Sequence, residues 1–183
     1  MQLFGDNSHL NTWIEKAKQG DRRAQKAIYD ALSGKMFAVC LRYMSDRQSA
    51  EDVLQEGFVS LFAKLDTYSG DGSFEGWARK IFVNAALMSL RKNDVLKEST
   101  DVDTAWNVSS EAPSAVQQIG YKELSKMISE LPAGFRTVFN MYVVEGYSHA
   151  EIAASLGISE TTSRSQLLRA RAMLQSKIKD KYR

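Results

Sequence analysis

Two arginines, a serine and a leucine lie close together near the C-terminal end of the chain, and their side chains have the chemistry to read DNA. An arginine bonds guanine through two parallel N–H donors in the major groove, and serine and apolar groups contact other base edges there. The four residues are Arg164, Ser165, Leu168 and Arg169. The apolar residues that recur around them at helical spacing are Leu167, Ala170, Leu174 and Ile178. This pattern predicts a helix that buries the apolar set and turns the first set outward.

The segment before this helix predicts a second helix and a sharp turn between the two. Ser148 and Glu151 have the spacing of a capping box, in which each side chain accepts the backbone N–H of the other residue. Gly157 supplies the left-handed conformation that ends a helix, and Ser159 can cap the next one. Together these signals favour a helix-turn-helix, which places its second helix in a major groove. The alternative is an ordinary helical hairpin whose arginines form a solvated face.

A second polar surface is expected on a helix over residues 50–65, which Ser45 and Gln48 would begin as a capping box. Its apolar side consists of Leu54, Phe58, Leu61 and Leu65. Its polar side consists of Asp52, Gln55, Glu56 and Ser60. Carboxylates beside an amide suit arginines and polar groups on a partner protein. The alternative is an acidic face that is merely solvated.

A turn-rich aromatic loop and a partly cationic stripe follow, and both suit single-stranded nucleic acid. Tyr68 lies in the loop TYSGDGS, before a helix predicted over residues 74–92. The expected core stripe of this helix is Phe74, Trp77, Ile81, Ala85 and Met88. Its second stripe is Lys80, Asn84, Leu87 and Arg91. Cations hold phosphates, and aromatic walls and amides hold unstacked bases, although aromatic residues at helical spacing are equally consistent with a plain core.

The charge is distributed unevenly along the chain. The 183 residues are 44% hydrophobic, which suits one medium domain or two small ones, and their formal net charge is +2. Residues 94–118 nevertheless carry five acidic side chains against one basic, whereas residues 119–183 carry ten basic against six acidic. The acidic segment has no sustained helical or strand period, so it predicts a linker between residues 1–93 and residues 119–183. The alternative is a surface loop of one domain.

Outside that linker the apolar residues follow a helical period, and no alternating strand patterns occur. We therefore predict an all-α fold of two small helical domains joined by a flexible acidic linker, the second domain containing the helix-turn-helix. Opening helices are expected over residues 11–19 and 24–43. The single cysteine, Cys40, lies in the apolar run MFAVCL and is expected to be a buried small hydrophobe.

The sequence gives no sign of export or membrane insertion. The start of the chain lacks a basic segment followed by an apolar one, and no apolar run approaches membrane-spanning length, so we expect a cytoplasmic protein. The two histidines, His9 and His149, make no plausible metal site.

An enzymatic alternative is a magnesium-dependent nuclease that uses Asp52 with Glu56, or Glu51 with Asp52. Two-metal sites need several converging carboxylates, whereas these lie on one exposed helical face. The spacing of a P-loop is also missing, and we expect neither catalysis nor a cofactor. The stronger alternative is an autonomous helix-turn-helix regulator that binds a duplex operator as a dimer.

Two long segments resemble the conserved regions of one protein family, in the family's order. They are AEDVLQEGFVSLFAKLDTYSGDGSFEGWARKIFVNAALMSLRK and LPAGFRTVFNMYVVEGYSHAEIAASLGISETTSRSQLLRARAML. They resemble the first conserved region and the C-terminal helix-turn-helix region of sigma-70 factors of bacterial RNA polymerase, in the extracytoplasmic-function (ECF) class. The resemblance implies a sigma factor that binds core RNA polymerase and directs transcription initiation at promoter DNA. It also implies a chain that is monomeric without polymerase and that has an anti-sigma protein as partner.

The resemblance assigns roles to the residues of the first segment. In the family, the acidic helix docks on the clamp helices of the polymerase, and the matching positions here are Asp52, Gln55 and Glu56. The loop from Tyr68 to Phe74 matches one that receives a base flipped out of the melted minus-10 element. Asn84 matches a polar residue near that pocket, and Lys80 and Arg91 would lie along the path of the strand.

The resemblance also assigns roles to the second segment, which would read the minus-35 element as duplex. The positions that match the base-contacting surface are Arg164, Ser165, Leu168 and Arg169. The implied phosphate contacts are Arg136, Thr162 and Arg171. The acidic linker matches a segment that threads towards the polymerase active centre. The chain departs from the family pattern at Ser163, usually apolar, at Gln166, often basic, and at Tyr142, where some relatives carry arginine.

Overall fold

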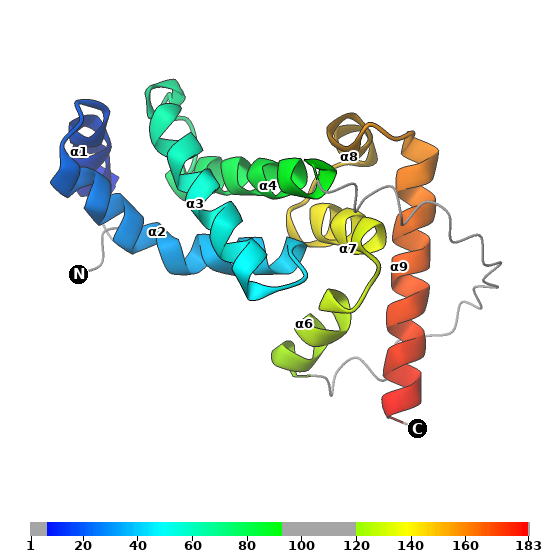
Figure 1. The fold of residues 1–183 in the computed structure, drawn as a ribbon. Coiled ribbons are helices and arrows are strands. Elements are labelled where there is room, and N and C mark those ends of the chain that lie inside the picture. The colour runs from blue at the N-terminus through cyan, green and yellow to red at the C-terminus, as the bar shows by residue number, and fades with distance from the viewer. Residues whose placement is uncertain (1–6, 93–119, 183) are drawn as a thin grey trace. The chain divides into compact units, whose positions relative to one another are not determined.

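The computed structural model describes residues 7–92 and 120–182, and within these ranges every element is helical (Figure 1). The chain divides into two compact units, Met1–Ser89 (unit 1) and Leu90–Arg183 (unit 2). These findings confirm the predicted all-α fold with two helical parts. The predicted linker over residues 94–118 lies outside the described ranges.

Unit 1 is built around two long helices, over residues 22–43 and 47–63, which pack against each other. Its elements are α1 (Asn7–Lys18), α2 (Arg22–Tyr43), α3 (Arg47–Ala63), the 3-10 helix η1 (Leu65–Thr67) and all but the last turn of α4 (Phe74–Lys92). α2 packs against both α1 and α3, as Figure 1 shows. The two opening helices are confirmed, although each begins before its predicted first residue. The predicted bounds of α4 match the structure.

Aspartates cap two of these helices. In α3 the aspartate stands in place of the serine that was predicted to begin the helix. The carboxylate of Asp21 accepts the backbone N–H groups of Arg23 and Ala24 and so caps α2. The carboxylate of Asp46 accepts the backbone N–H of Ser49 at 2.8 Å and caps α3. The predicted capping box that begins at Ser45 is therefore wrong, because the extended backbone that a cap needs falls one residue later. The bond from Ser49 N–H also holds the pKa of Asp46 below its ordinary value.

The buried face of α4 follows steps of four residues, and this displaces one part of the predicted core stripe. Phe74, Ala78 and Phe82 are buried in succession, and Leu87 is also buried. Met88, which was predicted to lie in the core, is 67% exposed. Steps of four turn slightly more than one full revolution, so the buried face drifts around the helix along its length. The predicted stripe mixed steps of three and four and missed this drift.

A glycine allows α3 and α4 to approach each other closely. A Cβ atom at Gly57 would lie 2.3 Å from Cδ1 of Phe82, a separation that no real side chain tolerates. The ring of Phe82 in turn meets the ring of Phe58 edge-on, with centroids 5.0 Å apart. Because residue 57 has no side chain, the ring of Phe82 in α4 occupies the space that a Cβ atom there would need.

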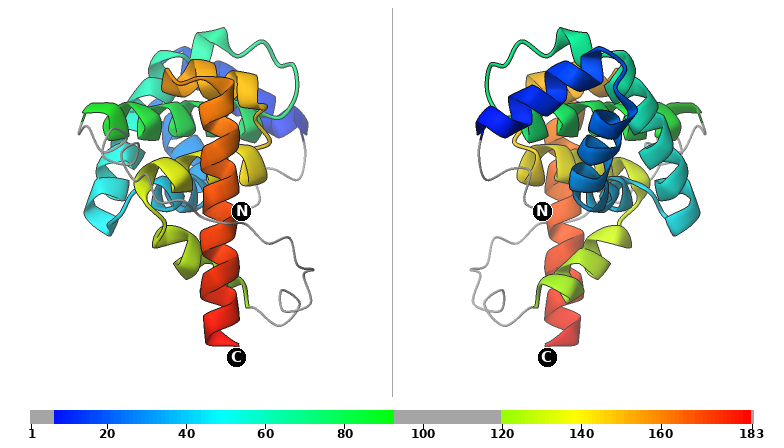
Figure 2. Two further views of the ribbon diagram at one scale, coloured as in Figure 1. Left: turned by 90° about the vertical axis from the view of Figure 1, so that its right-hand side faces the viewer. Right: turned by 90° about the vertical axis from the view of Figure 1, so that its left-hand side faces the viewer.

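Unit 2 arranges four short elements against one long helix. They are α6 (Tyr121–Ser129), α7 (Ala133–Phe139), the π-helix η3 (Asn140–Val144), α8 (His149–Leu156) and the long α9 (Glu160–Lys181). Both views in Figure 2 show α6 and α7 beside α9, with α8 near its N-terminal end. The core residues are Met127, Leu131, Phe135, Ala170, Leu174 and Ile178. The predicted buried stripe of α9 is confirmed.

Cys40 is fully buried, as predicted for a small apolar residue. Burial raises the pKa of its thiol to about 12, so the reactive thiolate is scarcely formed at neutral pH. Within the described parts of the chain, no helix is long and apolar enough to cross a membrane. The same residues contain no group of three side chains suited to holding a metal ion.

We predict that Gly57→Ala destabilises unit 1 by about 1 to 3 kcal/mol, because the added methyl group overpacks the ring of Phe82. Gly34→Ala is the matched control, since no atom lies within 4 Å of its Cβ position in the middle of α2. That substitution should stabilise the helix by up to about 1 kcal/mol through helix propensity alone. Thermal unfolding followed by circular dichroism measures both effects, and equal stabilisation by both variants would contradict the close approach.

Candidate nucleic-acid interface

The helix-turn-helix of unit 2 has the local geometry that its sequence predicts. The backbone N–H of Glu151 donates to Ser148 Oγ at 3.2 Å, and the N–H of Ser148 donates to Glu151 Oε2 at 2.8 Å, which completes the capping box. Gly157 ends α8 with a φ of +68° in the left-handed region. Ser159 then caps α9 by accepting the N–H of Thr162 at 3.0 Å. The start of α9 is therefore fixed relative to α8 by caps on both sides of the turn.

The outward face of α9 carries the predicted reading residues. Arg164 and Ser165 are exposed, Leu168 is 51% exposed and Arg169 is half-buried. The guanidinium of Arg164 pairs with Glu160 at 2.6 Å, one helical turn earlier. An exposed ion pair of this kind is weak, so the guanidinium can leave it for a stronger bidentate acceptor. The exposed Leu168 side chain adds an apolar group that can contact a thymine methyl in the major groove.

Two of the three expected phosphate contacts lie at the surface and one does not. Thr162 is half-buried near the start of α9, and Arg171 is exposed two turns further on. Arg136 is only 5% exposed, and its Nη1 donates to the backbone oxygens of Ser129 at 2.7 Å and Leu131 at 3.4 Å. The predicted phosphate contact at Arg136 does not fit this position. Its guanidinium is buried in unit 2 and bonds the backbone that connects α6 to α7.

The loop before α4 forms a small polar cavity with an aromatic wall. Tyr68 Oη donates to the backbone oxygen of Gly72 at 2.9 Å, and its ring centroid lies 5.1 Å from that of Phe74 and 5.3 Å from that of Trp77. The cavity has a volume of about 470 Å³. The residues that line it are Leu10, Asn11, Tyr68, Gly70, Gly72, Ser73, Phe74 and Glu75. Both Tyr68 and Phe74 are buried, so they form its wall and fix the loop rather than projecting into solvent.

The cationic stripe of α4 lies on the surface, with one exception. Lys80, Asn84 and Arg91 are exposed, as their predicted role as strand contacts requires. Leu87, which was placed in the same stripe, is 3% exposed and belongs to the core. The stripe is therefore polar throughout its exposed part.

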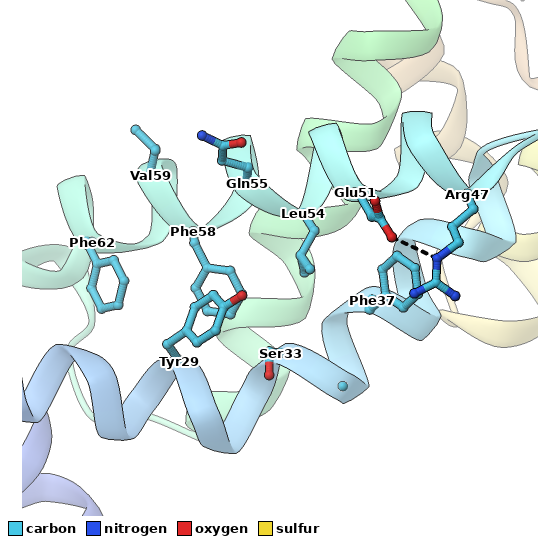
Figure 3. Close-up of a pocket in the computed structure, with 11 residues that line it drawn as sticks. Tyr29, Ser33, Phe37, Arg47, Glu51, Leu54, Gln55, Phe58, Val59 and Phe62 are labelled. Atoms are coloured by element: carbon cyan, nitrogen blue, oxygen red, sulfur yellow. Dashed lines mark hydrogen bonds and ion pairs between the residues drawn. The ribbon is translucent and has the colours of Figure 1, made fainter.

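The exposed ridge of α3 separates two grooves on the surface of unit 1. One groove, of about 750 Å³, lies between α2 and α3 and is rich in aromatic side chains (Figure 3). The other, of about 660 Å³, is lined by Asp52, Gln55, Glu56, Val59, Ser60, Ala85 and Met88. Gln55 and Val59 line both grooves, and the predicted polar residues of α3 are all on this ridge or beside it.

The structure adds two apolar residues to this surface that sequence reasoning missed. Val59 is 66% exposed, and Met88 of α4 lies in the same groove. The aromatic groove contributes Tyr29, whose ring centroid lies 4.5 Å from that of Phe58. The available signal was Val59, an apolar residue outside the helical period of its neighbours. A surface that combines carboxylates, an amide and exposed apolar groups is suited to binding another protein.

Comparison with known proteins finds sequence matches to two regions of one family. The Sigma-70 region 2 family matches residues 28–95, and the "Sigma-70, region 4" family matches residues 121–174. The chain is similar to the ECF RNA polymerase sigma-E factor of Escherichia coli (strain K12), with 27% identity over 176 residues that cover 90% of this chain and 92% of that protein. The sigma-E factor of Haemophilus influenzae is 26% identical and covered to 93% of its length.

Two solved structures share this fold. CnrH in complex with the cytosolic domain of CnrY has a TM-score of 0.50 and 20% identity, over 92% of this chain and 96% of that chain. The sigma factor RpoE in complex with the anti-sigma factor NepR from Bartonella quintana has a TM-score of 0.53 and 24% identity, over 84% and 96%. Both regions match in the family's order, and relatives align over 90% of the chain. The protein therefore belongs to the extracytoplasmic-function class of the sigma-70 family, whose members direct transcription initiation.

Proposed function

We propose that this sigma factor reads the minus-35 promoter element as duplex through α9 and the minus-10 element as a melted strand through the loop before α4. The observation that carries the proposal is the outward face of α9, where arginine, serine and leucine side chains lie exposed on a helix capped at its start. A major groove admits one helix, and these side chains reach guanine, other base edges and thymine methyl groups there.

The melted strand is read by a pocket rather than by exposed rings. The cavity beside Tyr68 and Phe74 offers an aromatic wall and polar groups from Asn11, Ser73 and Glu75. Flipping a base out of a duplex costs a few kcal/mol, and a pocket that repays this for one base turns melting into sequence recognition. Lys80, Asn84 and Arg91 guide the strand along α4, since cations hold its phosphates.

Core polymerase docks on the ridge of α3. The exposed carboxylates of Asp52 and Glu56 steer and pair with cationic groups, while Val59 and Met88 supply apolar area for burial. A surface that combines exposed charges with apolar area is typical of a specific protein interface.

An anti-sigma protein is a further proposed partner. The similar sigma factor RpoE was solved in complex with an anti-sigma factor, NepR. The aromatic groove between α2 and α3 supports such a partner here, because it offers exposed apolar area on unit 1.

Run-off transcription with purified core polymerase tests the proposed function directly. We expect start sites that share an upstream duplex element and a downstream melted element, with no ATP-dependent opening step. Size-exclusion chromatography supplies the second readout, in which the chain runs as a monomer and shifts into the polymerase peak. A dimer that binds a palindromic duplex without polymerase would instead support an autonomous regulator.

We predict that reversing the charge of Asp52 and Glu56 to lysine weakens core binding at least about tenfold, because like charges then meet across the docking surface. DNA binding by α9 should not change, since it belongs to the other unit. Glu15→Lys with Asp30→Lys is the matched control, because it reverses two exposed carboxylates on α1 and α2. A core-binding titration decides the matter, and equal loss in both double variants would argue against α3 as the docking helix.

We predict that Arg169→Ala costs about 1 to 3 kcal/mol of binding and relaxes preference at one promoter position, as expected for a bidentate base contact. Lys179→Ala removes one cation from the same helix further along and serves as the control for net charge. The measurement is holoenzyme binding to a set of promoters substituted singly in the minus-35 element. Uniform weakening on every promoter would identify Arg169 as a phosphate contact instead.

A further inference from the structure

His149 makes a directional contact between the two helices of the helix-turn-helix. Its Nδ1 lies 2.9 Å from Oγ of Ser163, which is within hydrogen-bonding distance. His149 is the first residue of α8, and Ser163 lies in the first turns of α9. Ser163 is fully buried. A buried hydroxyl needs a hydrogen-bond partner, and a hydrogen bond fixes an angle that apolar packing alone does not.

The imidazole is itself held in place by a tyrosine. The rings of His149 and Tyr142 are stacked, with centroids 4.5 Å apart and planes inclined by 24°. Tyr142 belongs to the π-helix η3, a geometry that occurs often at functional sites. The guanidinium carbon of Arg171 lies 5.9 Å from the tyrosine ring centroid, in the range of a cation–π contact. Ser163, His149, Tyr142 and Arg171 therefore form one chain of contacts, which we term the His149 brace.

The brace is anchored at both ends of the stretch of α9 that reads DNA. Ser163 directly precedes Arg164, and Arg171 follows Arg169 by two residues. The two anchor points are separated by about 12 Å along the helix axis, from a rise of 1.5 Å per residue. Contacts at two such points restrain both the rotation of α9 about its axis and its tilt against α8.

Base contacts and phosphate contacts respond differently to a small change of helix pose. Hydrogen bonds to base edges need their donors within a few tenths of an ångström and roughly 10–20° of the productive geometry. Attraction to phosphates is electrostatic and depends little on sequence or on such small displacements. A device that fixes the pose of α9 therefore affects sequence preference more than overall affinity.

We propose that His149 is a positioning residue that, through its hydrogen bond to Ser163, sets the pose in which α9 reads base edges. This inference rests on the proposed reading of the minus-35 element by α9. Tyr142 supports this role by holding the plane of the imidazole through its ring stack.

Three substitutions separate the hydrogen bond from the ring stack. Ser163→Ala removes the hydroxyl and leaves a small side chain in its buried position. His149→Phe keeps a ring for Tyr142 to stack on but cannot bond Ser163. His149→Asn loses the ring and places an amide where it can replace Nδ1 as the partner of Ser163 Oγ. Gln175→Ala, on an exposed position of α9 beyond the brace, is the matched control.

The test uses the full chain in holoenzyme with two DNA fragments. One is a promoter that the wild-type holoenzyme transcribes, and the other is the same fragment with its upstream element scrambled. We expect Ser163→Ala and His149→Phe each to lower the affinity ratio between the two fragments by about fivefold to tenfold, with binding of the scrambled fragment unchanged. His149→Asn should restore most of the ratio, and the double variant Ser163→Ala with His149→Phe should lose no more than either single variant.

Two results would overturn the inference. The first is an unchanged ratio in Ser163→Ala, because the hydrogen bond would then have no bearing on base reading. The second is a parallel loss on both fragments together with a lower melting temperature, because the pair would then serve stability alone. If the wild-type holoenzyme itself does not distinguish the fragments, the proposed reading by α9 fails and the inference falls with it.

Discussion

Burial of one face of α9 is the interaction on which unit 2 depends. Side chains on a helix are fixed about 100° apart, so burying Ala170, Leu174 and Ile178 decides which residues face outward. The helices that cover this face are short, and helices of their length are marginal in water without tertiary packing. The buried guanidinium of Arg136 helps to hold them, because it bonds two backbone oxygens at their junction. A charged group that lies inside the unit therefore supports the helix that carries the side chains proposed to read DNA.

Unit 1 uses the same logic to build a surface for a partner. α3 packs on α2 with one side, and the absence of a side chain at Gly57 lets α4 approach it closely. That approach brings Met88 of α4 to the groove that also holds Val59, Asp52 and Glu56 of α3. The proposed docking surface is thus made by two helices, although its charges all come from one. Charges speed and orient encounter, while apolar area supplies binding energy, so both contributions belong to one interface.

The contact between the half-buried His149 and the buried Ser163 shows a different use of polar chemistry. Hydrophobic packing is non-directional, so it brings two helices together without fixing their angle closely. A hydrogen bond has a preferred geometry, and leaving the buried hydroxyl of Ser163 unsatisfied is unfavourable. The stacked ring of Tyr142 restricts the imidazole further. If α9 reads base edges as proposed, such a contact serves mainly to fix the angle of its arginines and adds less to stability.

The sequence by itself determined the helices of unit 1, the two helices and the caps of the helix-turn-helix and the outward set on α9, because these follow from local spacing and from groups bonded within one or two turns. It did not single out α6, α7 or η3. It also identified the polar residues of α3 and α4 that remain candidates for polymerase and strand contacts. Only the tertiary structure decided which apolar residues stay exposed and which charged one is buried. Met88 faces solvent because the buried face of α4 drifts around the helix. Val59 faces solvent because it lies on the ridge of α3 between the two grooves. Arg136 turns inward to the backbone that connects α6 to α7, and His149 of α8 contacts Ser163 of α9, because the packing of the helices brings these groups together. Such contacts depend on how helices pack, and no local period carries that information.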